Sequence, residues 1–254
     1  MSTARVDLNA TIAPQLATVA NVHAERIDDL ADDQRKILVG ASPIVLDIET
    51  VADLDWIASS EEAWLAAYDP PGNMTKPETI AANIAEALKS RVSKAPLRAL
   101  DGKVIAAGIA RLWGDGDPVA WAGDEREVLG HLSAWMELVP RPVLCGYGIR
   151  IFDIPFLQAR YAALDLEAHW LPNPRDYRGT IDALDLLPGK LDVWLARFGL
   201  PRKTASGADV ATMTVEEVRA YCAHDVHVER ALLRRLSHVY PSLRRLAPAE
   251  HAQP

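Results

Sequence analysis

The spacing of apolar residues along this chain changes repeatedly between the period of strands and the period of helices. Apolar runs of strand length, bounded by turn-forming residues, cover residues 42–51, 102–113, 118–123 and 141–148. Apolar residues three or four positions apart, the spacing of a helix face, cover residues 76–95, 124–139, 152–166, 190–199 and 214–236. Residues 179–187 form one more strand-like stretch. These periods predict an α/β protein.

The order of these elements predicts how the sheet is built. The strands of the first half follow one another as hairpins, with a turn at residues 114–117. The strands of the second half alternate with helices, which is typical of parallel pairing. A mixed β-sheet flanked by helices combines both arrangements. Ligand sites in such sheets lie at the carboxyl ends of the strands, so we expect the functional site there.

Local signals predict several helix ends. Thr75 is the expected N-cap of the first long helix, with Pro77 in its first turn. Thr214 and Glu217 have the spacing of a capping box at the start of the last helix. Gly199 is expected to close the short helix before it.

Composition divides the chain into three regions. Residues 1–40 are polar and rich in Ala, and we expect an N-terminal extension with a loosely patterned helix. Residues 41–240 are expected to form the main domain, with a helical insertion at about residues 52–100. Residues 241–254 are expected to form a C-terminal tail.

Overall composition narrows the class of protein. Of the 254 residues, 49% are hydrophobic and 24% are charged, which is typical of a globular domain. No apolar run approaches the roughly 20 residues of a membrane span, and residues 1–20 lack the apolar core of a signal peptide. Cys145 and Cys222 fit no metal or disulfide pattern, so we expect buried thiols in a reducing compartment. We therefore expect a cytoplasmic protein without a membrane partner.

The net charge of −8 argues against a protein that holds nucleic acid by bulk electrostatic attraction. An acidic site that recruits divalent cations would itself contribute negative charge, so a nucleic-acid enzyme stays open. Basic residues do gather near the C-terminus, among them Arg230, Arg234 and Arg235. We expect these arginines to form a solvated helix face.

Two acids stand two positions apart at the end of the first apolar run, in the stretch IVLDIET of residues 44–50. Side chains at positions i and i+2 of a strand share a face, so Asp47 and Glu49 lie together while Ile48 faces the opposite way. Two like charges at this distance raise one pKa unless a cation lies between them. Oxygen ligands suit Mg²⁺ or Mn²⁺. The pair is therefore a candidate metal site.

Two later segments carry further candidate acids. Asp153 stands just before Pro155 at the start of a predicted helix, and on this stretch alone an N-cap is the better explanation. Tyr221 and Asp225 are four positions apart, so they lie on one face of the last helix. The rest of that face is apolar, and an acid in such surroundings needs a partner.

Together these motifs resemble those of the DEDD superfamily of 3′–5′ exonucleases, which have a ribonuclease H-like fold. Asp47 and Glu49 match the first motif of the superfamily, Asp153 the second, and Tyr221 with Asp225 the third. A tyrosine four positions before the last acid is the mark of the DEDDy branch. The resemblance runs from about residue 43 to about residue 236, most of the chain.

Within the superfamily the chain is most similar to the proofreading-exonuclease domain of family B DNA polymerases and its stand-alone relatives, some of them encoded by phages. The stretches TIDALDLL (180–187), SGADV (206–210) and AYCAHDV (220–226) carry this likeness. In the DEDDh branch a His stands five positions before the last acid, where this chain has Ala220. His224 and His227 have other offsets, so we expect them to be ordinary helix residues.

The resemblance implies phosphodiester hydrolysis with two divalent ions, Mg²⁺ or Mn²⁺. Asp47 would bridge both ions, Glu49 and Asp225 would complete the site of one ion, and Asp153 would hold the other. Tyr221 would orient the attacking water. The substrate would be the 3′ end of single-stranded DNA or RNA, with DNA favoured and nucleoside 5′-monophosphates as products. A replication or repair protein is a further implied partner.

Four residues beside the motifs are candidate substrate contacts, namely Thr50, Tyr147, Gly148 and Phe152. Many members of the family have Asn at the position of Gly148, so this departure is expected to change substrate fit or lower activity. Tyr147, Phe152 and Trp194 are candidates for stacking on bases. Core packing is the expected role for at least two of these three.

Three other functions compete with this hypothesis. A non-catalytic nucleic-acid-binding or polymerase-associated module on the same fold would share the motifs, as would an RNA-directed exoribonuclease. A glycosidase-type carboxylate pair needs only two acids and no metal, and it leaves the third motif unexplained. Metal-dependent release of mononucleotides separates an exonuclease from a binding module. Activity that is indifferent to EDTA would favour the glycosidase.

Overall fold

The computed structural model describes residues 42–173 and 179–240, together with Leu243 and Leu246. The predicted extension of residues 1–40 and most of the predicted tail of residues 241–254 lie outside the described residues. The domain boundaries stay predictions. Within the described ranges, none of the helices is long and apolar enough to cross a membrane.

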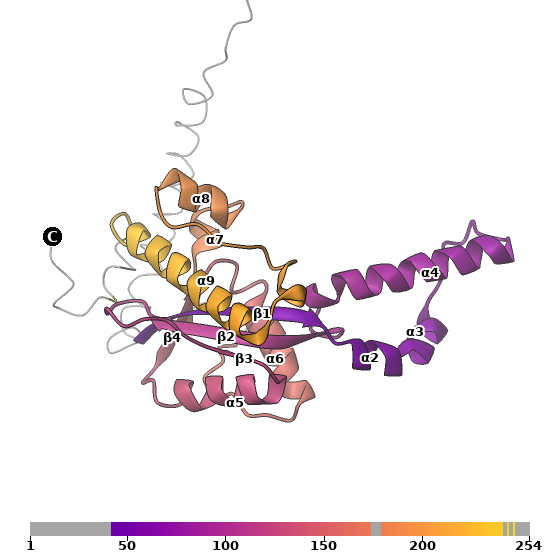
Figure 1. Cartoon of the computed structure of the whole chain (residues 1–254), viewed down its shortest axis with the longest axis horizontal. Helices are drawn as coiled ribbons and strands as arrows, with labels where there is room; N and C mark the ends of the chain where they lie inside the picture. The colour runs from indigo at the N-terminus through magenta and orange to yellow at the C-terminus, as the bar shows by residue number, and fades with distance from the viewer. Residues whose placement is uncertain (1–41, 174–178, 241–242, 244–245, 247–254) are drawn as a thin grey trace, which may run out of the picture.

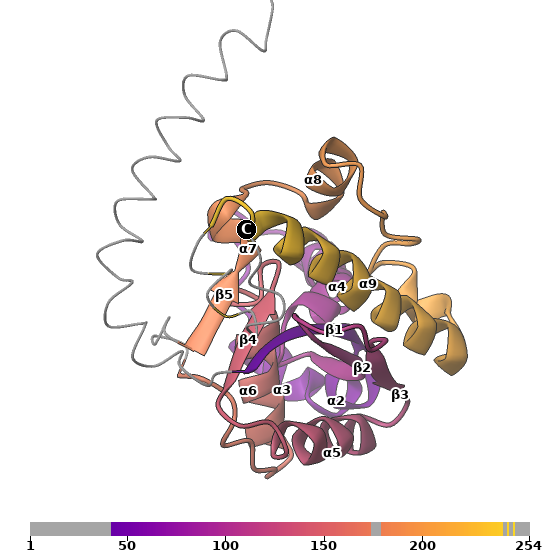
Figure 2. The same ribbon diagram turned by 90° about the vertical axis from the view of Figure 1, so that its left-hand side faces the viewer.

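A five-stranded mixed sheet forms the centre of the molecule, in the order β3-β2-β1-β4-β5 (Figure 2). Its strands are β1 (Ser42–Ala52), β2 (Gly102–Arg111), β3 (Val119–Ala122), β4 (Pro142–Gly146) and β5 (Thr180–Asp182). β2 pairs antiparallel with β1 and β3, whereas β1, β4 and β5 run parallel. This mixed sheet with its flanking helices confirms the predicted α/β fold and is consistent with a ribonuclease H-like fold.

Helices cover both faces of the sheet (Figure 1). α5 (Glu125–Met136) and α6 (Asp153–Ala163) lie on one face, and the long α9 (Val215–Leu236) crosses the other. The short helices α7 (Ala183–Leu186) and α8 (Leu191–Arg197) lie on the α9 side, where they share its hydrophobic core. β1 is therefore a central strand with a helix layer on each face.

The alternation of side chains along β1 explains both layers. The β1 residues that pack in the core with α5 and α6 are Ile44, Leu46 and Ile48. Val45 faces the other way and packs in the core that includes α9. Because the period of a strand is two, the next residues on the α9 side are Asp47 and Glu49. The strand thus turns its two acids toward α9, and Ile48 faces the opposite layer as predicted.

An arm of helices lies between β1 and β2 and projects from the sheet (Figure 1). Its elements are α2 (Leu54–Ser59), α3 (Glu61–Ala67), α4 (Pro77–Lys94) and the 3-10 helix η1 (Ala95–Leu97). The arm begins and ends at adjacent points, since the Asp53 amide donates to the Asp101 carbonyl at 2.8 Å. The buried guanidinium of Arg91 lies 2.7 Å from the Asp101 carboxylate. The base of the arm is therefore held beside the end of β1.

Two of the predicted helix ends are confirmed and one is wrong. The capping box of Thr214 and Glu217 is present at the start of α9. Gly199 follows α8 with a φ of 64°, the left-handed conformation of a helix end. Thr75 is not an N-cap, because Lys76 takes that position and α4 begins at Pro77. A residue before Pro is driven into extended backbone, so the proline itself sets the start of this helix.

The strand-like stretch of residues 179–187 is a strand only in its first half. β5 ends at Asp182, and α7 begins at the next residue. The Asp182 carboxylate accepts a hydrogen bond from the Leu184 amide at 2.9 Å and so caps α7. A short apolar run fits either a strand or a buried helix, so its spacing alone did not reveal the change.

The prediction of a solvated arginine face is wrong for two of the three residues. Arg230 is buried and donates to the Gly116 carbonyl at 2.6 Å. Arg234 donates to the Leu112 carbonyl at 2.8 Å. Only Arg235 is exposed. The carbonyls around the β2–β3 turn need donors, and these guanidinium groups on α9 supply them.

Candidate active site

A cleft of about 480 Å³ opens at the carboxyl end of β1, beside the loop that follows β4. Because β1 and β4 are parallel, their carboxyl ends meet at the same edge of the sheet. Asp47, Glu49, Asp153 and Tyr221 line the cleft. Residues of all three sequence motifs therefore meet at the edge where a ligand site was expected.

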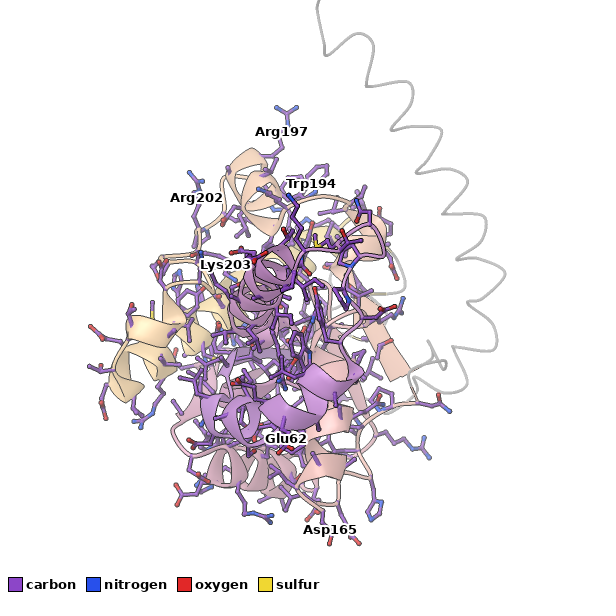
Figure 3. All side chains as sticks on the ribbon, turned by 90° about the vertical axis from the view of Figure 1, so that its right-hand side faces the viewer. Glu62, Asp165, Trp194, Arg197, Arg202 and Lys203 are labelled. Atoms are coloured by element: carbon purple, nitrogen blue, oxygen red, sulfur yellow. The ribbon has the colours of Figure 1, made fainter. Side chains whose placement is uncertain are left out.

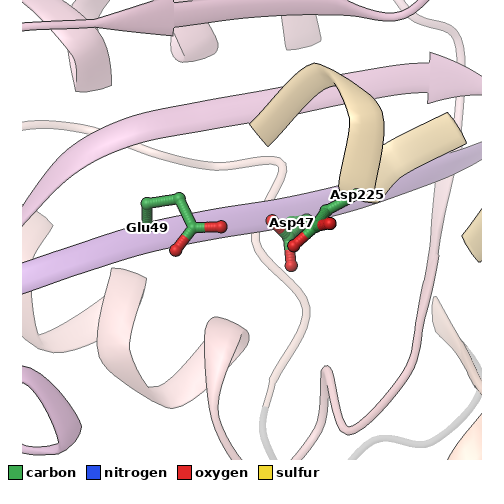
Figure 4. A group of neighbouring side chains, drawn as sticks. All are labelled: Asp47, Glu49 and Asp225. Atoms are coloured by element: carbon green, nitrogen blue, oxygen red, sulfur yellow. The ribbon is translucent and has the colours of Figure 1, made fainter. Parts of the chain in front are cut away.

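Three carboxylates converge at this edge. Asp47, Glu49 and Asp225 each offer one oxygen, and these oxygens all lie within 4.8 Å of one another. Figure 4 shows Asp47 and Glu49 on β1, with Asp225 reaching toward them from α9. Glu49 is 6% exposed and Asp225 is 0% exposed. The first and third motifs therefore form one acidic cluster.

The close approach of α9 to the sheet depends on a glycine of β2. Gly108 is the pairing partner of Asp47 in the antiparallel register of β1 and β2. A Cβ atom at Gly108 would lie 2.8 Å from Val226 Cγ2 and 2.9 Å from the Cys222 sulfur, both on α9. Only a residue without a side chain admits the helix at this distance. Gly108 thereby lets α9 bring Asp225 to Asp47.

Asp153 is the first residue of α6 and is 6% exposed. It is not the N-cap, because Phe152 takes that position. Instead, the Asp153 carboxylate accepts a hydrogen bond from the Ile48 amide at 3.2 Å, between the two acids of β1. The alternative of a simple cap is therefore wrong. The second motif is tied to the backbone of the first.

The environment of the acids favours their protonated forms. Burial, opposed by the Lys203 ammonium and reinforced by Asp225, raises the pKa of Asp47 to about 7. Burial and then the carboxylate of Asp47 raise the pKa of Glu49 to about 10. Burial and then Asp47 raise the pKa of Asp153 well above its usual range. A cation between these groups would offset both the burial and the repulsion that favour their protonated forms.

Lys203 supplies a positive charge to this cluster. Its ammonium lies 2.6 Å from Oδ2 of Asp225 and 5.6 Å from the centroid of the Tyr221 ring. Burial lowers the pKa of Lys203, but the carboxylates of Asp47 and Asp225 outweigh it, and the net shift in pKa is upward. In Figure 3 Arg202 extends away from the molecule, whereas Lys203 lies within its outline. Nothing in the sequence around Lys203 marked it as a partner of these acids.

Tyr221 lies on the same face of α9 as Asp225, as predicted, and is 4% exposed. Its hydroxyl donates to the Ala205 carbonyl at 3.3 Å, in the segment that carries Lys203. His224 also contacts this segment, since its Nε2 lies 2.8 Å from the Arg202 carbonyl. Two side chains of α9 thus fix the segment, and His224 has a packing role as expected.

Comparison with known proteins adds one likeness of structure. No family model matches the chain, and no curated protein matches it. Among solved structures, the chain is similar to the family B DNA polymerase from the hyperthermophilic archaeon Pyrobaculum calidifontis, with 18% identity and a TM-score of 0.48. The match covers 76% of this chain and 24% of the polymerase chain. At this identity and TM-score the likeness carries no argument about function.

Asp182 is a residue that sequence reasoning missed. Its carboxylate accepts hydrogen bonds from the Gly148 amide at 2.7 Å and the Arg150 amide at 3.0 Å. Gly148 has a φ of 80°, a conformation that favours glycine. Asp182 thus fixes the loop that leads from β4 to Asp153. The sequence holds no local signal for this role, because the end of β5 at Asp182 was itself not predicted.

The hydroxyls of two candidate substrate residues bind the protein itself. Thr50 donates to the Pro96 carbonyl at 2.6 Å, which ties the end of β1 to the base of the arm. Tyr147 donates to the Leu187 carbonyl at 2.8 Å. Both residues line the cleft. Thr50 and Tyr147 therefore form part of the cleft wall, and their hydroxyls donate to the protein backbone.

The other aromatic candidates differ in position. Phe152 lines the cleft, and its ring lies 5.5 Å from that of Phe156, measured between centroids. Trp194 is not among the residues that line the cleft within the described ranges. Its indole nitrogen donates to the Pro188 carbonyl at 3.0 Å, and its ring packs against Phe198. Trp194 therefore has the packing role that was expected for at least two of the aromatics.

The donor set of the cluster fits a hard divalent cation. Asp47, Glu49 and Asp225 offer only oxygen atoms, and Mg²⁺ and Mn²⁺ prefer such ligands. The three oxygens are close enough together to contact one ion. The acids also raise one another's pKa, so a cation has repulsion to relieve. The cluster is therefore able to bind a metal ion.

Proposed function

We propose that this protein is a 3′–5′ exonuclease that uses two divalent ions, Mg²⁺ or Mn²⁺, to hydrolyse single-stranded nucleic acid. DNA is the favoured substrate, and nucleoside 5′-monophosphates are the products. One observation carries the proposal. The three sequence motifs, which resemble those of the DEDDy exonucleases, come together at the end of β1: Asp47, Glu49, Asp153 and Tyr221 line one cleft, and Asp225 lies with Asp47 and Glu49.

Divalent ions, when bound, would lower the pKa of the attacking water and neutralise charge on the phosphate oxygens. Asp47 is suited to contact both ions, because Glu49 and Asp225 lie within reach of it and Asp153 is tied to the adjacent backbone. Tyr221 lines the same cleft, and its hydroxyl, which donates to the Ala205 carbonyl, keeps an acceptor lone pair with which it would orient the water. Each acid of the three motifs thus has a role in holding or positioning charge.

The walls of the cleft suit the end of a single strand. Leu97 and Ile151 line it and are 70% and 73% exposed. Large apolar side chains that remain exposed beside an acidic site are suited to contact unpaired bases, which have apolar faces. Paired bases would hide those faces. This arrangement supports a single-stranded end as the substrate.

Digestion of end-labelled oligonucleotides tests the proposal. Single-stranded DNA and RNA labelled at the 5′ end should shorten one nucleotide at a time with Mn²⁺ and stay intact with EDTA. Asp47→Asn should abolish this digestion, because it removes a charge that both ions need. Tyr221→Phe should lower the rate by on the order of a hundredfold, because the ring stays and only the hydroxyl goes.

A matched control keeps the result specific. Glu216 is an exposed acid in the first turn of α9, so Glu216→Gln should digest DNA at the wild-type rate. Equal rates for the wild type and Asp47→Asn would overturn the proposal. Binding of single-stranded DNA without digestion would favour the non-catalytic module, and faster digestion of RNA would favour an exoribonuclease.

A further inference from the structure

A fifth carboxylate that none of the motifs includes lines the same cleft. Glu229 stands one helical turn after Asp225 on α9, so the two side chains lie on one face of the helix. Glu229 is 4% exposed. Among the described residues, its Oε2 is buried without a hydrogen-bond partner. An acid in this condition is rare and needs a physical explanation.

Two buried acids outside the cluster, Asp182 and Glu125, have donors. The Asp182 carboxylate accepts three backbone amides, as described above. Glu125 is 8% exposed and binds the Arg160 guanidinium at 2.7 Å, with the Val104 amide at 2.8 Å. A buried carboxylate that lacks such partners costs free energy, and that cost is relieved only by a proton or a cation. Glu229 therefore differs from the structural acids of this fold.

Glu229 shares the cleft with the acids of the first two motifs. Asp47, Glu49 and Asp153 line the same cleft as Glu229. Its carboxylate is outside the close group of oxygens that Asp47, Glu49 and Asp225 form. Burial, and then the carboxylates of Asp47 and Asp153, raise its pKa well above the usual range. Glu229 is therefore an additional acid of the cleft and not a member of that group.

An ion beside Asp153 would be short of protein ligands without Glu229. Asp47, Glu49 and Asp225 form a group of three oxygens for one ion. Asp153 is outside that group, and one of its oxygens is engaged by the Ile48 amide. An ion held by Asp47 and Asp153 alone would have two protein carboxylates, fewer than the first ion has. The unpartnered Oε2 of Glu229 lines the same cleft as these two acids and is available as a further donor.

We propose that Glu229 is a metal ligand, which binds the divalent ion held between Asp47 and Asp153. The proposal rests on the two-ion site of the proposed function and adds one residue to it. The protein would then offer three carboxylates to each ion, with Asp47 shared between them.

Binding of Mn²⁺ by calorimetry and by electron paramagnetic resonance tests the proposal without any measure of activity. The wild type should bind two Mn²⁺ ions. Glu229→Gln, which keeps the size of the side chain and removes its charge, should bind one ion with unchanged affinity and the other at least about tenfold more weakly. Glu216→Gln, an exposed change on the same helix, should bind both ions as the wild type does.

Thermal unfolding gives a second readout, because the substitution that weakens metal binding should stabilise the metal-free protein. In EDTA at neutral pH, Glu229→Gln should unfold at a higher temperature than the wild type, by about 2 °C or more, because Glu229 must take up a proton when the chain folds and Gln need not. Addition of saturating Mn²⁺ should raise the unfolding temperature of Glu229→Gln by less than it raises that of the wild type. Should Glu229→Gln fail to fold, Glu229→Asp replaces it, and weaker binding of one of its two ions is expected.

Three results would overturn the assignment. In the first, the wild type binds a single ion, and in the second, Glu229→Gln and Glu229→Asp bind both ions with wild-type affinity. In the third, the substitution weakens the binding of both ions equally, which the loss of one charge from the cleft would cause without any direct contact. Digestion of DNA separates this inference from the proposed function. If the wild type binds two Mn²⁺ ions but digests no nucleic acid, the proposed exonuclease activity is wrong, and the role of Glu229 as a metal ligand still stands.

Discussion

The ammonium of Lys203 lies 2.6 Å from Oδ2 of Asp225, a carboxylate with no exposed surface. Lys203 comes from the segment before α9, and Asp225 comes from the middle of that helix. The ammonium of Lys203 is thus a positive charge among acids that raise one another's pKa. A divalent cation that binds Asp225 must therefore share that carboxylate with Lys203 or displace it.

Lys203→Met should destabilise the protein in EDTA by about 2 kcal/mol, because a buried carboxylate loses its charged hydrogen-bond donor. With saturating Mg²⁺ the loss should be smaller, since the cation then supplies the charge. Urea unfolding in the two conditions measures the difference. Lys190 also lines the cleft but is exposed, so Lys190→Met should change stability by less than about 0.5 kcal/mol in either condition.

Gly108→Ala should lower the free energy of unfolding by about 1–3 kcal/mol, because its Cβ would overlap Val226 and Cys222. The same change should move α9 away from β2 and so weaken binding of Mn²⁺ by the cluster. Titration with Mn²⁺ checks the second effect. Gly130 is an exposed glycine of α5 with open space around it, so Gly130→Ala should stabilise the protein slightly. Equal effects of the two changes would contradict the role given to Gly108.

Asp182→Asn should lower stability by about 1–3 kcal/mol and lower nuclease activity as well. The one acceptor oxygen of Asn can serve the Gly148 and Leu184 amides, which both donate to Oδ1 of Asp182. The Arg150 amide, which donates to Oδ2, would then face an NH₂ group, and the loop to Asp153 would lose one of its two bonds to this residue. Activity per folded molecule, with folding monitored by circular dichroism, separates this effect from unfolding. Asp165→Asn is a suitable control, because Asp165 is exposed and Asn tolerates its φ of 52°.

Stability in EDTA should fall as pH rises from about 4 to about 7. The pKa of Asp47 is about 7 in the folded protein and about 4 in an unfolded chain, so the folded protein binds more protons in this window. The favourable contribution is complete below about pH 4 and is lost as pH rises through about 7. Glu49, with a pKa of about 10, extends the fall to higher pH.

Urea unfolding between about pH 5 and about pH 8 measures this slope. Saturating Mg²⁺ should flatten it, because the ion takes the place of the protons. Glu49→Gln should also flatten it in EDTA. Stability in EDTA that rises with pH over this window would show that the acids of the cluster ionise freely in the folded protein.

The spacing of apolar residues was enough to predict the sheet and the shared face of Asp47 and Glu49, because a strand has a fixed period of two. It was not enough to decide between a cap and a functional acid at Asp153. Both roles place an acid at the start of a helix. The difference is a hydrogen bond from Ile48, a residue far away in the sequence.

The residues that sequence reasoning missed depend on contacts between distant segments. Lys203 belongs to a short basic stretch, and only the fold shows that it meets Asp225. Glu229 follows the helical spacing of a core position, and nothing local marks it as an acid of the cleft. Gly108 fits an ordinary strand pattern, and its importance comes from the helix that packs on it. Tertiary contacts, which the sequence does not display, decide all three.

The arm of residues 54–100 leaves and rejoins the sheet at one backbone hydrogen bond, between Asp53 and Asp101. In topological terms it is a single long hairpin loop between β1 and β2. Each doubling of the length of such a loop costs only about 0.6 kcal/mol of closure entropy. The arm can thus be lengthened, shortened or exchanged during evolution without a change in the register of the acid-bearing strand. The surface that the arm presents and the chemistry beside it are free to diverge separately.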